Sequence, residues 1–384
     1  MNSKHELGQY FTTNPILQQR VFDFILNNPS NILEPSIGQG DLISFISKLL
    51  PNITFDMFEI DNNIKLLNDI QKKNVIYGDF IQQPISKTYQ TIIGNPPYVR
   101  TKKGNLYIDF IEKCYHLLEY NGELIFIVPS DFLKLTSASN LLNIMMSNGT
   151  FTHIFHPHNE KMFDNASIDV IIFRYCKNHS IDKRVLYNDN LLYVTNTNGL
   201  ITFNKDKIHD FAIMNDYFNI YVGLVSGKED VFKNQQLGNI HVLNGQDKLD
   251  KYIYIDSFPS DNKNINQHLL SHKNTLIKRG IRKFNNNNWF EWGAPRNISA
   301  MTKNMGKDCI YIYNLTRKTD VAFLGKVNYF GGSLIMLLPK KKCNLNNVIS
   351  YLNSDVFKDN FIFSGRFKIG HRQLSNSLLP LLYL

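Results

Sequence analysis

The sequence lacks the features by which membrane and secreted proteins are recognised. Its most apolar stretch, Leu124 to Val128, ends at Pro129 and is far too short to span a bilayer. Residues 1–11 contain no apolar segment of the kind found in a signal peptide. We therefore expect a cytoplasmic protein without a membrane partner.

Cysteine is scarce, and metal-binding patterns are missing. The four cysteines form no Cys-x-x-Cys pair, so neither a zinc site nor a disulfide framework is expected; they are Cys114, Cys176, Cys309 and Cys343. His153, His156 and His158 stand close together, but no acidic residue has the spacing of a zinc-protease motif. We expect reduced thiols and no metal cofactor.

Positive charge is unevenly distributed over the 384 residues. Residues 1–180 hold 15 Lys and Arg against 17 Asp and Glu, whereas residues 181–384 hold 27 against 16. The second half therefore carries a net +11 and the first half −2, which together give the net charge of +9. Such an excess is either an ordinary solvated surface or a surface for a polyanion, and an asymmetry between halves favours a nucleic-acid partner.

The first half alternates strand-like and helix-like segments. Helices are predicted over 14–26, 41–50, 62–72 and 106–118, and strands over 31–33, 54–60, 75–79, 91–94 and 124–128. This alternation predicts an α/β fold with a parallel sheet covered by helices on both faces. Ligands of such sheets bind at the carboxyl ends of the strands.

The second half is rich in Asn, Lys, Tyr and Phe and has only short β-like segments, over 252–255, 310–313 and 334–338. Its length and different composition predict a separate domain. We place the boundary near residue 180, which gives domains 1–180 and 181–384.

Three strand ends of the first half carry residues suited to a nucleoside. Glu34-Pro35-Ser36-Ile37-Gly38-Gln39-Gly40-Asp41 follows a strand and opens a helix, so its glycines allow close backbone approach to an anionic group. It lacks the third glycine of dinucleotide sites, which disfavours NAD. Glu59 is placed to accept from ribose hydroxyls and Asp79 from an adenine amino group, while Phe80 packs on the ring. Each position alone could be a solvated strand end, but together they predict a nucleoside site.

Asn95-Pro96-Pro97-Tyr98 directly follows the predicted strand 91–94. A rigid turn is the simplest interpretation, but the surrounding site favours a catalytic one. The amino nitrogen of adenine is a poor nucleophile because its lone pair is delocalised. The Asn95 side-chain oxygen and the Pro96 carbonyl could bind its two N–H groups, which localises the lone pair mainly in the transition state. The two prolines stiffen the turn, and Tyr98 offers a face for stacking.

The motifs Gly8-Gln9-Tyr10-Phe11-Thr12, Glu34–Gly40, Asp79-Phe80 and Asn95–Tyr98, in this order, resemble the gamma class of bacterial and viral DNA adenine-N6 methyltransferases. That class includes type II modification enzymes similar to the Taq methylase. The resemblance covers residues 8–175. It implies a class I (Rossmann-like) S-adenosylmethionine-dependent methyltransferase domain, followed by a mixed α+β target-recognition domain. It also implies S-adenosyl-L-methionine as cofactor, S-adenosyl-L-homocysteine as product and double-stranded DNA as partner.

The resemblance also assigns site residues. The cofactor-binding residues that it implies are Tyr10, Thr12, Glu34, Pro35, Ser36, Gly38, Gly40, Glu59, Ile60, Asp79, Phe80 and Asn95. The catalytic residues that it implies are Asn95, Pro96, Pro97, Tyr98 and Tyr175. Tyr175, with Phe173 as fallback, matches an aromatic residue that stacks on the far face of the base, although core packing of a strand explains either equally well. Tyr107 matches a further position near the cofactor.

A base inside a duplex must be swung out before it is methylated, so the basic second half is expected to hold the DNA. Candidate contacts there are Lys278, Arg279, Arg282, Lys283, Arg296, Arg317, Arg366, Lys368, His371 and Arg372. Arg100, Lys102 and Lys103 form a further basic loop just after the catalytic turn.

Two alternatives stay open. The same Asn-Pro-Pro-Tyr turn serves enzymes that methylate RNA or a protein glutamine, and a DNA-binding protein without catalysis is the second alternative. No convincing nuclease motif is present. We therefore expect a monomer that works as the modification part of a restriction-modification system, with any cognate restriction endonuclease acting separately.

Overall fold

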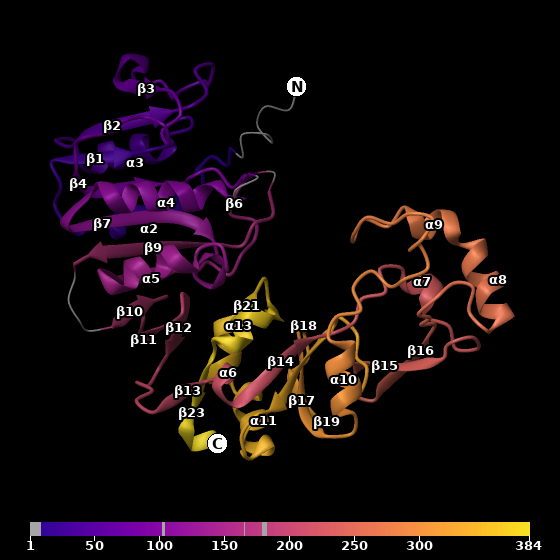
Figure 1. Cartoon of the computed structure of the whole chain (residues 1–384). Coiled ribbons are helices and arrows are strands. Elements are labelled where there is room, and N and C mark those ends of the chain that lie inside the picture. Colours follow the sequence, from indigo (N-terminus) through magenta and orange to yellow (C-terminus); the bar gives the residue numbers. More distant parts are fainter. Residues whose placement is uncertain (1–8, 102–103, 165, 179–182) are drawn as a thin grey trace. The chain divides into compact units, whose positions relative to one another are not determined.

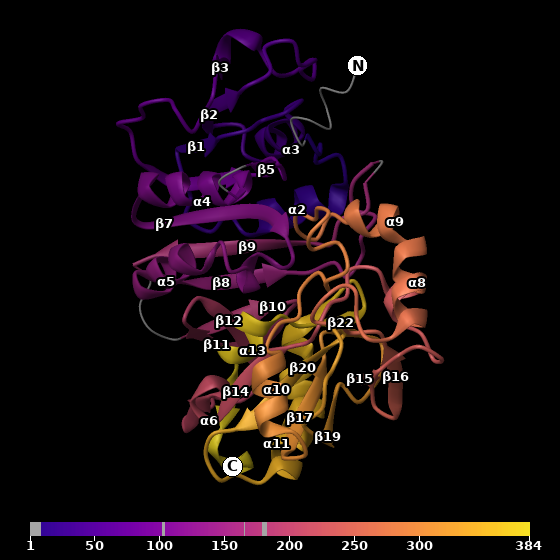
Figure 2. The same ribbon diagram turned by 45° about the vertical axis from the view of Figure 1, so that its right-hand side comes forward.

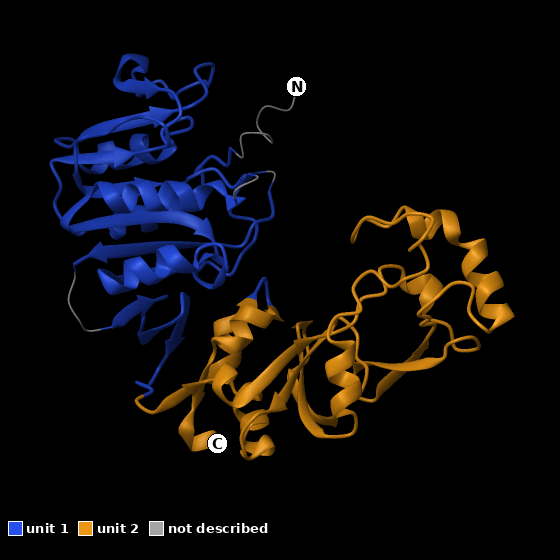
Figure 3. Ribbon diagram, viewed as in Figure 1, with its two compact units in different colours: residues 1–208, 363–365 blue, residues 209–362, 366–384 orange. Residues whose placement is uncertain are grey.

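A computed structural model describes residues 9–101, 104–164, 166–178 and 183–384. The chain forms two compact units (Figure 3): unit 1 comprises Met1–Ile208 with Phe363–Gly365, and unit 2 comprises His209–Ile362 with Arg366–Leu384. Unit 1 extends beyond the boundary placed near residue 180, because the strands that follow pair with its sheet. Gly8, Lys102 and Lys103 lie outside the described residues.

Helices and strands alternate through most of unit 1 (Figure 1). In chain order they are α2 (Pro15–Asp23), β1 (Asn31–Glu34), α3 (Asp41–Leu49), β2 (Thr54–Glu59), η1 (Lys72–Asn74), β3 (Val75–Tyr77), β4 (Tyr89–Gly94), β5 (Arg100–Thr101), β6 (Gly104–Asn105), α4 (Leu106–Leu117), β7 (Leu118–Pro129), η2 (Phe132–Lys134), α5 (Ser139–Ser147), β8 (Gly149–Phe155), β9 (Val170–Lys177), β10 (Arg184–Tyr187), β11 (Asn190–Thr197) and β12 (Leu200–Asn204).

The helix predicted over 62–72 does not form, and this prediction was wrong. The segment consists of turns and the short η1. At its start the Asp61 carboxylate accepts the backbone N–H of Asn63 at 3.0 Å, and the Asp61 carbonyl accepts that of Ile64. Asp and Asn side chains compete in this way with helical hydrogen bonds, so the apolar spacing alone was misleading.

The sheet of unit 1 has ten strands in the order β12-β11-β10-β8-β9-β7-β4-β1-β2-β3. Figure 2 shows β3, β2, β1, β7, β9 and β8 in this succession. The strands β3, β2, β1, β4 and β7 are parallel, as predicted. Beyond them β9 runs antiparallel between β7 and β8, and β10, β11 and β12 extend the sheet. The sheet is therefore mixed rather than wholly parallel.

Both faces of this sheet are covered, because successive residues of a strand point to opposite sides. In β7, Leu124, Phe126 and Val128 pack with α4 and α5, whereas Ile125 and Ile127 pack with α2 and α3. This double burial explains the continuous apolar run of β7.

The order of the strands creates a crevice beside β1. The chain continues from β1 to β2 on one side, whereas β4 lies on the other side of β1. Ligands of open α/β sheets bind at the carboxyl ends of the strands where the order reverses. Glu34, Glu59 and Asn95 stand at the ends of β1, β2 and β4, so three predicted site residues meet here.

Unit 2 is made of shorter elements (Figure 1). They are β13 (Phe211–Ile213), α6 (Met214–Tyr217), β14 (Phe218–Val222), α7 (Glu229–Phe232), β15 (Ile240–Gly245), β16 (Lys248–Tyr252), α8 (Lys263–Ser271), α9 (Lys273–Ile277), α10 (Ile298–Asn304), β17 (Asp308–Tyr313), β18 (Leu315–Thr316), β19 (Ala322–Lys326), β20 (Leu334–Pro339), α11 (Leu345–Asn353), α12 (Asp355–Lys358), η3 (Asp359–Phe361), β21 (Ile362–Phe363), β22 (Arg366–Lys368), α13 (His371–Ser375), β23 (Leu378–Pro380) and η4 (Leu381–Tyr383).

The core of unit 2 is built on an antiparallel sheet of four strands, β14-β20-β17-β19. Apolar side chains of β17 and β20 pack there with Met301 of α10 and with Trp289 and Trp292 of the preceding loop. The strands predicted over 310–313 and 334–338 lie inside β17 and β20, whereas only Tyr252 of the segment 252–255 belongs to a strand. Within the described part of the chain, no helix is long and apolar enough to cross a bilayer.

Candidate active site

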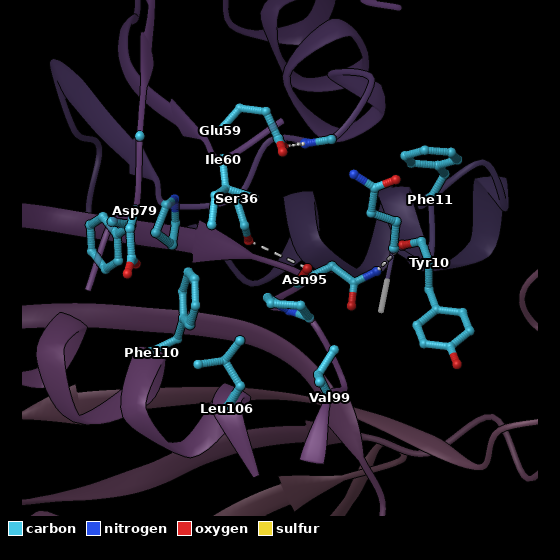
Figure 4. A pocket seen from close by; sticks show the side chains of 16 residues that line it. Tyr10, Phe11, Ser36, Glu59, Ile60, Asp79, Asn95, Val99, Leu106 and Phe110 are labelled. Atoms are coloured by element: carbon cyan, nitrogen blue, oxygen red, sulfur yellow. Dashed lines mark hydrogen bonds between the residues drawn. The ribbon is translucent and has the colours of Figure 1, made fainter. Parts of the chain in front are cut away.

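A pocket lies at the carboxyl ends of β1, β2, β3 and β4 (Figure 4). Its lining residues are Gln9, Tyr10, Phe11, Pro35, Ser36, Gly38, Glu59, Ile60, Gly78, Asp79, Phe80, Asn95, Pro97, Val99, Leu106 and Phe110. Figure 4 shows Asp79 and Phe110 at one end of the pocket and Asn95 and Tyr10 at the other. Most of the predicted cofactor residues therefore share one cavity.

The glycine-containing turn after β1 forms one wall of the pocket. Gly38 has φ +59° and Gly40 has φ +94°, a region that residues with a Cβ rarely adopt. A Cβ on Gly38 would lie 3.1 Å from the Phe11 ring, and one on Gly40 would lie 2.6 Å from Ile70. Gly38 therefore lets the Phe11 ring approach closely in the pocket wall, whereas Gly40 serves the packing against Ile70 and does not line the cavity.

Glu59 at the end of β2 ties two loops together at the rim. Its carboxylate accepts the N–H of Gly38 and the N–H of Asp61, both at 2.9 Å. Burial raises the pKa of this carboxyl, and the backbone donors oppose that shift. A carboxylate has about four acceptor positions, so Glu59 keeps acceptor capacity toward the pocket.

Glu34 lies beneath the pocket rather than in its wall. Its side chain is 1% exposed and accepts the N–H of Ser36 at 3.2 Å. Burial raises the pKa of this carboxyl to about 8, and the charge of Glu59 adds to the effect. Thr12 is also buried and absent from the lining. Glu34, Gly40 and Thr12 therefore lie behind the residues that line the pocket, and their contact with the cofactor stays a prediction.

The end of β3 supplies Asp79 and Phe80. Asp79 is exposed and accepts the N–H of Ile81 at 2.9 Å. The buried Phe80 ring stacks on Phe110 of α4, with centroids 5.4 Å apart. Phe110 and Leu106 are one turn apart on α4 and both line the pocket. Sequence reasoning missed them, because their spacing is equally typical of core packing.

Lys113 of α4 fixes the loop that follows Asp79. Its ammonium donates to the carbonyls of Phe80, Ile81 and Gln83, and it lies 4.6 Å from the centroid of the Phe80 ring. Burial lowers the pKa of Lys113. This side chain therefore secures both the backbone and the ring at one end of the pocket.

The Asn95 side chain is held in one orientation. Its Nδ2 group donates to the Tyr10 carbonyl at 2.7 Å and to the Thr12 hydroxyl at 3.1 Å. Its Oδ1 atom accepts from the Tyr98 hydroxyl at 2.6 Å. The segment near the N-terminus thus determines which end of the amide acts as donor and which as acceptor.

Tyr98 belongs to a cluster of aromatic rings beside Asn95. Its ring stacks on Tyr10 with centroids 5.4 Å apart and meets the edge of Phe163 at 6.3 Å and of Tyr107 at 6.0 Å. Its hydroxyl also lies 3.1 Å from the Ile127 carbonyl, and burial raises its pKa well above the usual value. Tyr107 is buried behind Tyr98 and does not line the pocket.

Tyr175 does not reach this cluster, so its predicted role as a stacking residue is corrected. It is 0% exposed, and its hydroxyl donates to the Met145 carbonyl at 2.8 Å. Phe173, the fallback, is equally buried and packs on Phe132. Both side chains project from β9 into the core below α4 and α5. The strand-core interpretation of these two residues was the correct one.

Phe163, which sequence reasoning missed, belongs to the aromatic cluster of Tyr10 and Tyr98. It lies in the loop between β8 and β9, with its ring 5.9 Å from that of Tyr10. The ends of this loop are joined by His156 and Asp169, whose Nε2 and Oδ1 atoms are 2.8 Å apart. Ser130 donates to the other Asp169 oxygen at 2.7 Å. Periodicity cannot find a residue in such a loop.

The three histidines do not form one cluster. The His156 ring lies 3.9 Å from that of His158, whereas His153 contacts Thr152 and Phe24. In the described segments, no group of three or more His, Cys, Asp or Glu side chains is arranged to hold a metal ion.

The basic candidates of unit 2 differ in their surroundings. Arg279 is 8% exposed and donates only to backbone carbonyls, so it is a structural residue. Arg282 forms an ion pair with Glu291 at 2.5 Å. The His371 ring nitrogen lies 3.0 Å from the Ile220 carbonyl. Lys278 and Lys283 are exposed and remain candidates for contact with a partner.

Comparison with known proteins agrees with this geometry. Residues 43–163 match the model of the family described as Eco57I restriction-modification methylase. The chain is 34% identical over 211 residues to type II methyltransferase M.HincII of Haemophilus influenzae, which covers 49% of this chain and 40% of that protein. It is 26% identical over 218 residues to type II methyltransferase M.AccI of Acinetobacter calcoaceticus, with coverage of 49% and 40%. The matches thus span less than half the length of these relatives.

A solved structure shares the fold at low identity. The type IIL restriction-modification enzyme MmeI, solved in complex with DNA, superposes with a TM-score of 0.59 and 10% identity over 98% of this chain and 64% of that chain. Together with the strand order, this places unit 1 in the class I methyltransferase fold. The match of residues 43–163 to that family's model agrees with the resemblance of the motifs.

Proposed function

We propose that the protein is a site-specific DNA methyltransferase that modifies the N6 amino group of adenine and uses S-adenosylmethionine. The observation that carries this proposal is the Asn95 amide, held with its oxygen as an acceptor beside the pocket that Glu59 and Asp79 also line. The relatives named above are type II methyltransferases, which favours a role as the modification part of a restriction-modification system.

The pocket fits the cofactor that the fold implies. Glu59 keeps acceptor capacity for ribose hydroxyls, Asp79 is an exposed acceptor for an adenine amino group, and Phe110 and Ile60 offer apolar contacts. The turn that contains Pro35, Ser36 and Gly38 lines the part of the pocket that we assign to the amino-acid part. When bound, S-adenosylmethionine supplies a methyl group already activated by its sulfonium charge.

The catalytic turn binds and orients the amino group of the substrate. Asn95 Oδ1 has a second lone pair besides the one used by Tyr98, and the Pro96 carbonyl supplies another acceptor. Two acceptors on one amino group favour a tetrahedral nitrogen with a localised lone pair. Because the Nδ2 bonds fix the amide before the substrate arrives, little reorganisation is needed in the transition state.

Phe163 is the residue that we assign to the far face of the target base. It comes from a different loop than Tyr98, and the two rings meet edge to face. A flipped base bound at Asn95 would find aromatic surface from both loops.

Duplex DNA is the substrate that the charge distribution favours over RNA or a protein glutamine. Unit 2 holds 23 Lys and Arg against 13 Asp and Glu, so it is suited to a polyanion. A monomer suffices for this activity, since each strand of a target can be modified in a separate encounter. A cognate restriction endonuclease would act separately, and the work on DNA favours a cytoplasmic location.

The test is incubation of the full chain with methyl-labelled S-adenosylmethionine and mixed genomic DNA, followed by nucleoside mass spectrometry and modification-sensitive sequencing. N6-methyladenine at one short motif is the expected result. Label in RNA or protein but not in DNA would overturn the choice of substrate. Cofactor binding without transfer to any of the three would favour the non-catalytic alternative.

A further inference from the structure

An open hollow lies on unit 2 beside the turn that precedes α7. It is lined by Gly227, Lys228, Asn274, Thr275, Lys278 and Arg279. Three of these side chains are cationic, two are uncharged hydrogen-bonding groups, and none is a carboxylate. A neighbouring hollow shares Gly227 and Lys228 but is also lined by Glu229 and Asp230, which makes it far less suited to an anion.

Arg279 builds the floor of this hollow. Its guanidinium donates to the carbonyls of Leu276, Ser226, Trp289 and Glu291, at distances from 2.7 to 2.9 Å. One buried side chain thereby joins three separate segments of the chain. Its acceptors are uncharged, so the positive charge is not neutralised by them.

Aromatic packing keeps Arg279 in place. The centroid of the Phe284 ring lies 3.8 Å from its central carbon, and that of Phe232 lies at 5.3 Å. Burial lowers the pKa of Arg279 to about 10, which still leaves it charged at neutral pH. A cation held this firmly beneath a surface attracts anions to that surface.

The wall formed by Gly227 depends on the absence of a side chain. Gly227 has φ +80°, and a Cβ there would lie 3.1 Å from Ile281 and 3.6 Å from the Arg279 side chain. The backbone can therefore approach Arg279 closely. On the opposite wall Thr275 and Lys278 are exposed, one turn apart around the end of α9.

We propose that this hollow binds a backbone phosphate of duplex DNA, with the Lys278 ammonium and the Thr275 hydroxyl as donors. Lys228 contributes less, because it already forms an ion pair with Asp230 at 2.8 Å. Lys278 forms no ion pair with any residue that the structure describes. The inference rests on the proposed function and deepens it, since it names a contact for the DNA partner.

The test compares two charge reversals of equal size on the same unit. Lys278→Glu removes the proposed donor, whereas Lys342→Glu changes an exposed lysine just beyond β20. Binding of a fluorescein-labelled duplex is measured by anisotropy over a series of salt concentrations. Lys278→Glu is expected to weaken binding about 10-fold and to reduce the salt slope by about 1. Lys342→Glu is expected to weaken it less than ~3-fold.

Equal losses in the two variants would overturn the proposal, because attraction would then follow total charge rather than the hollow. Thr275→Val removes a donor without a change of charge, and a loss of about 3-fold is expected there. Thermal unfolding at the wild-type temperature in all variants serves as the folding control. If the wild-type protein binds no duplex at all, the proposed function is wrong. If the wild type binds duplex and Lys278→Glu binds it with the same affinity, only the proposed phosphate site in the hollow is wrong.

Discussion

At Asn95 a single side chain connects two distant parts of the chain. Its Nδ2 atom is bound by the segment of Tyr10 and Thr12, and its Oδ1 atom faces the space beside Tyr98. Asn95→Ala is therefore expected to reduce methyl transfer by ~1000-fold, because an acceptor that acts in the transition state is lost. Cofactor affinity, measured by calorimetry, should change less than ~3-fold. Unchanged turnover would contradict the proposed role.

Glu34 makes stability depend on pH. Its pKa rises from 4.5 to about 8 on folding, so above pH 4.5 the unfolded state ionises first and stability falls until about pH 8. Glu34→Gln removes this loss. We expect the variant to gain roughly 3 to 5 kcal/mol over the wild type at pH 9, and little at pH 4. Urea unfolding at the two pH values measures this, and an equal difference at both would contradict it.

The assignment of Phe163 instead of Tyr175 can be tested by two substitutions. Phe163→Ala should lower kcat about 10-fold or more, since stacking on a base is lost. Phe163→Trp should restore most of the rate. Tyr175→Phe removes only the bond to the Met145 carbonyl and should keep the rate within about twofold. A larger loss in Tyr175→Phe than in Phe163→Ala would reverse the assignment.

Single residues at strand ends could be predicted, because a motif tied to a strand end fixes where the side chain emerges. Glu59, Asp79 and Asn95 all line the pocket. The sequence could not separate Glu34, which supports the wall, from its neighbour Pro35, which lines it, because burial depends on the strands packed alongside. Tyr175 failed for a related reason: β9 is buried on both faces, so an aromatic residue there is core.

At the scale of elements, Lys113 connects α4 to the loop that follows Asp79 at one end of the pocket. Lys113→Met removes the donor to the Phe80, Ile81 and Gln83 carbonyls, so the Asp79–Phe80 end of the pocket should loosen. We expect affinity for adenosine and S-adenosylmethionine to fall about 10-fold, and affinity for methionine to stay unchanged.

Lys177 offers a matched control for this prediction. It lies 5.1 Å from the Tyr115 ring centroid and donates to the carbonyls of Tyr115 and Leu118, at the other end of α4. Lys177→Met should lower stability in a similar way and leave adenosine affinity unchanged. If both variants lose adenosine affinity equally, Lys113 acts only through the stability of α4.

Helices and strands were predicted correctly where the apolar spacing agreed with the residues that typically begin or end an element. The predicted helix over 106–118 forms as α4, and the strands before Glu34, Glu59 and Asn95 form as β1, β2 and β4. It failed over 62–72, where side-chain turns replace a helix, and over 252–255. It also did not detect that β9 inserts antiparallel beside β7, since strand order is set by pairing across long separations.

At the scale of the whole molecule, charge divides between the two units. Unit 1 has 19 Lys and Arg against 20 Asp and Glu, whereas unit 2 has an excess of ten positive charges. Duplex binding should therefore fall at least ~100-fold between about 50 and about 200 mM salt. Cofactor affinity should change less than ~3-fold over the same range, because its pocket lies in unit 1. Anisotropy and calorimetry measure the two, and a flat salt response of duplex binding would contradict a phosphate-binding unit 2.

The proline after Asn95 has a consequence for the chemical lifetime of the protein. Asparagine deamidates when the backbone nitrogen of the next residue attacks its side-chain carbonyl. This attack needs an N–H that Pro96 does not have. Asn-Gly pairs such as Asn148-Gly149 and Asn198-Gly199 have no such protection. On prolonged storage, deamidation is therefore expected to accumulate at those pairs, while the amide on which the chemistry depends stays intact.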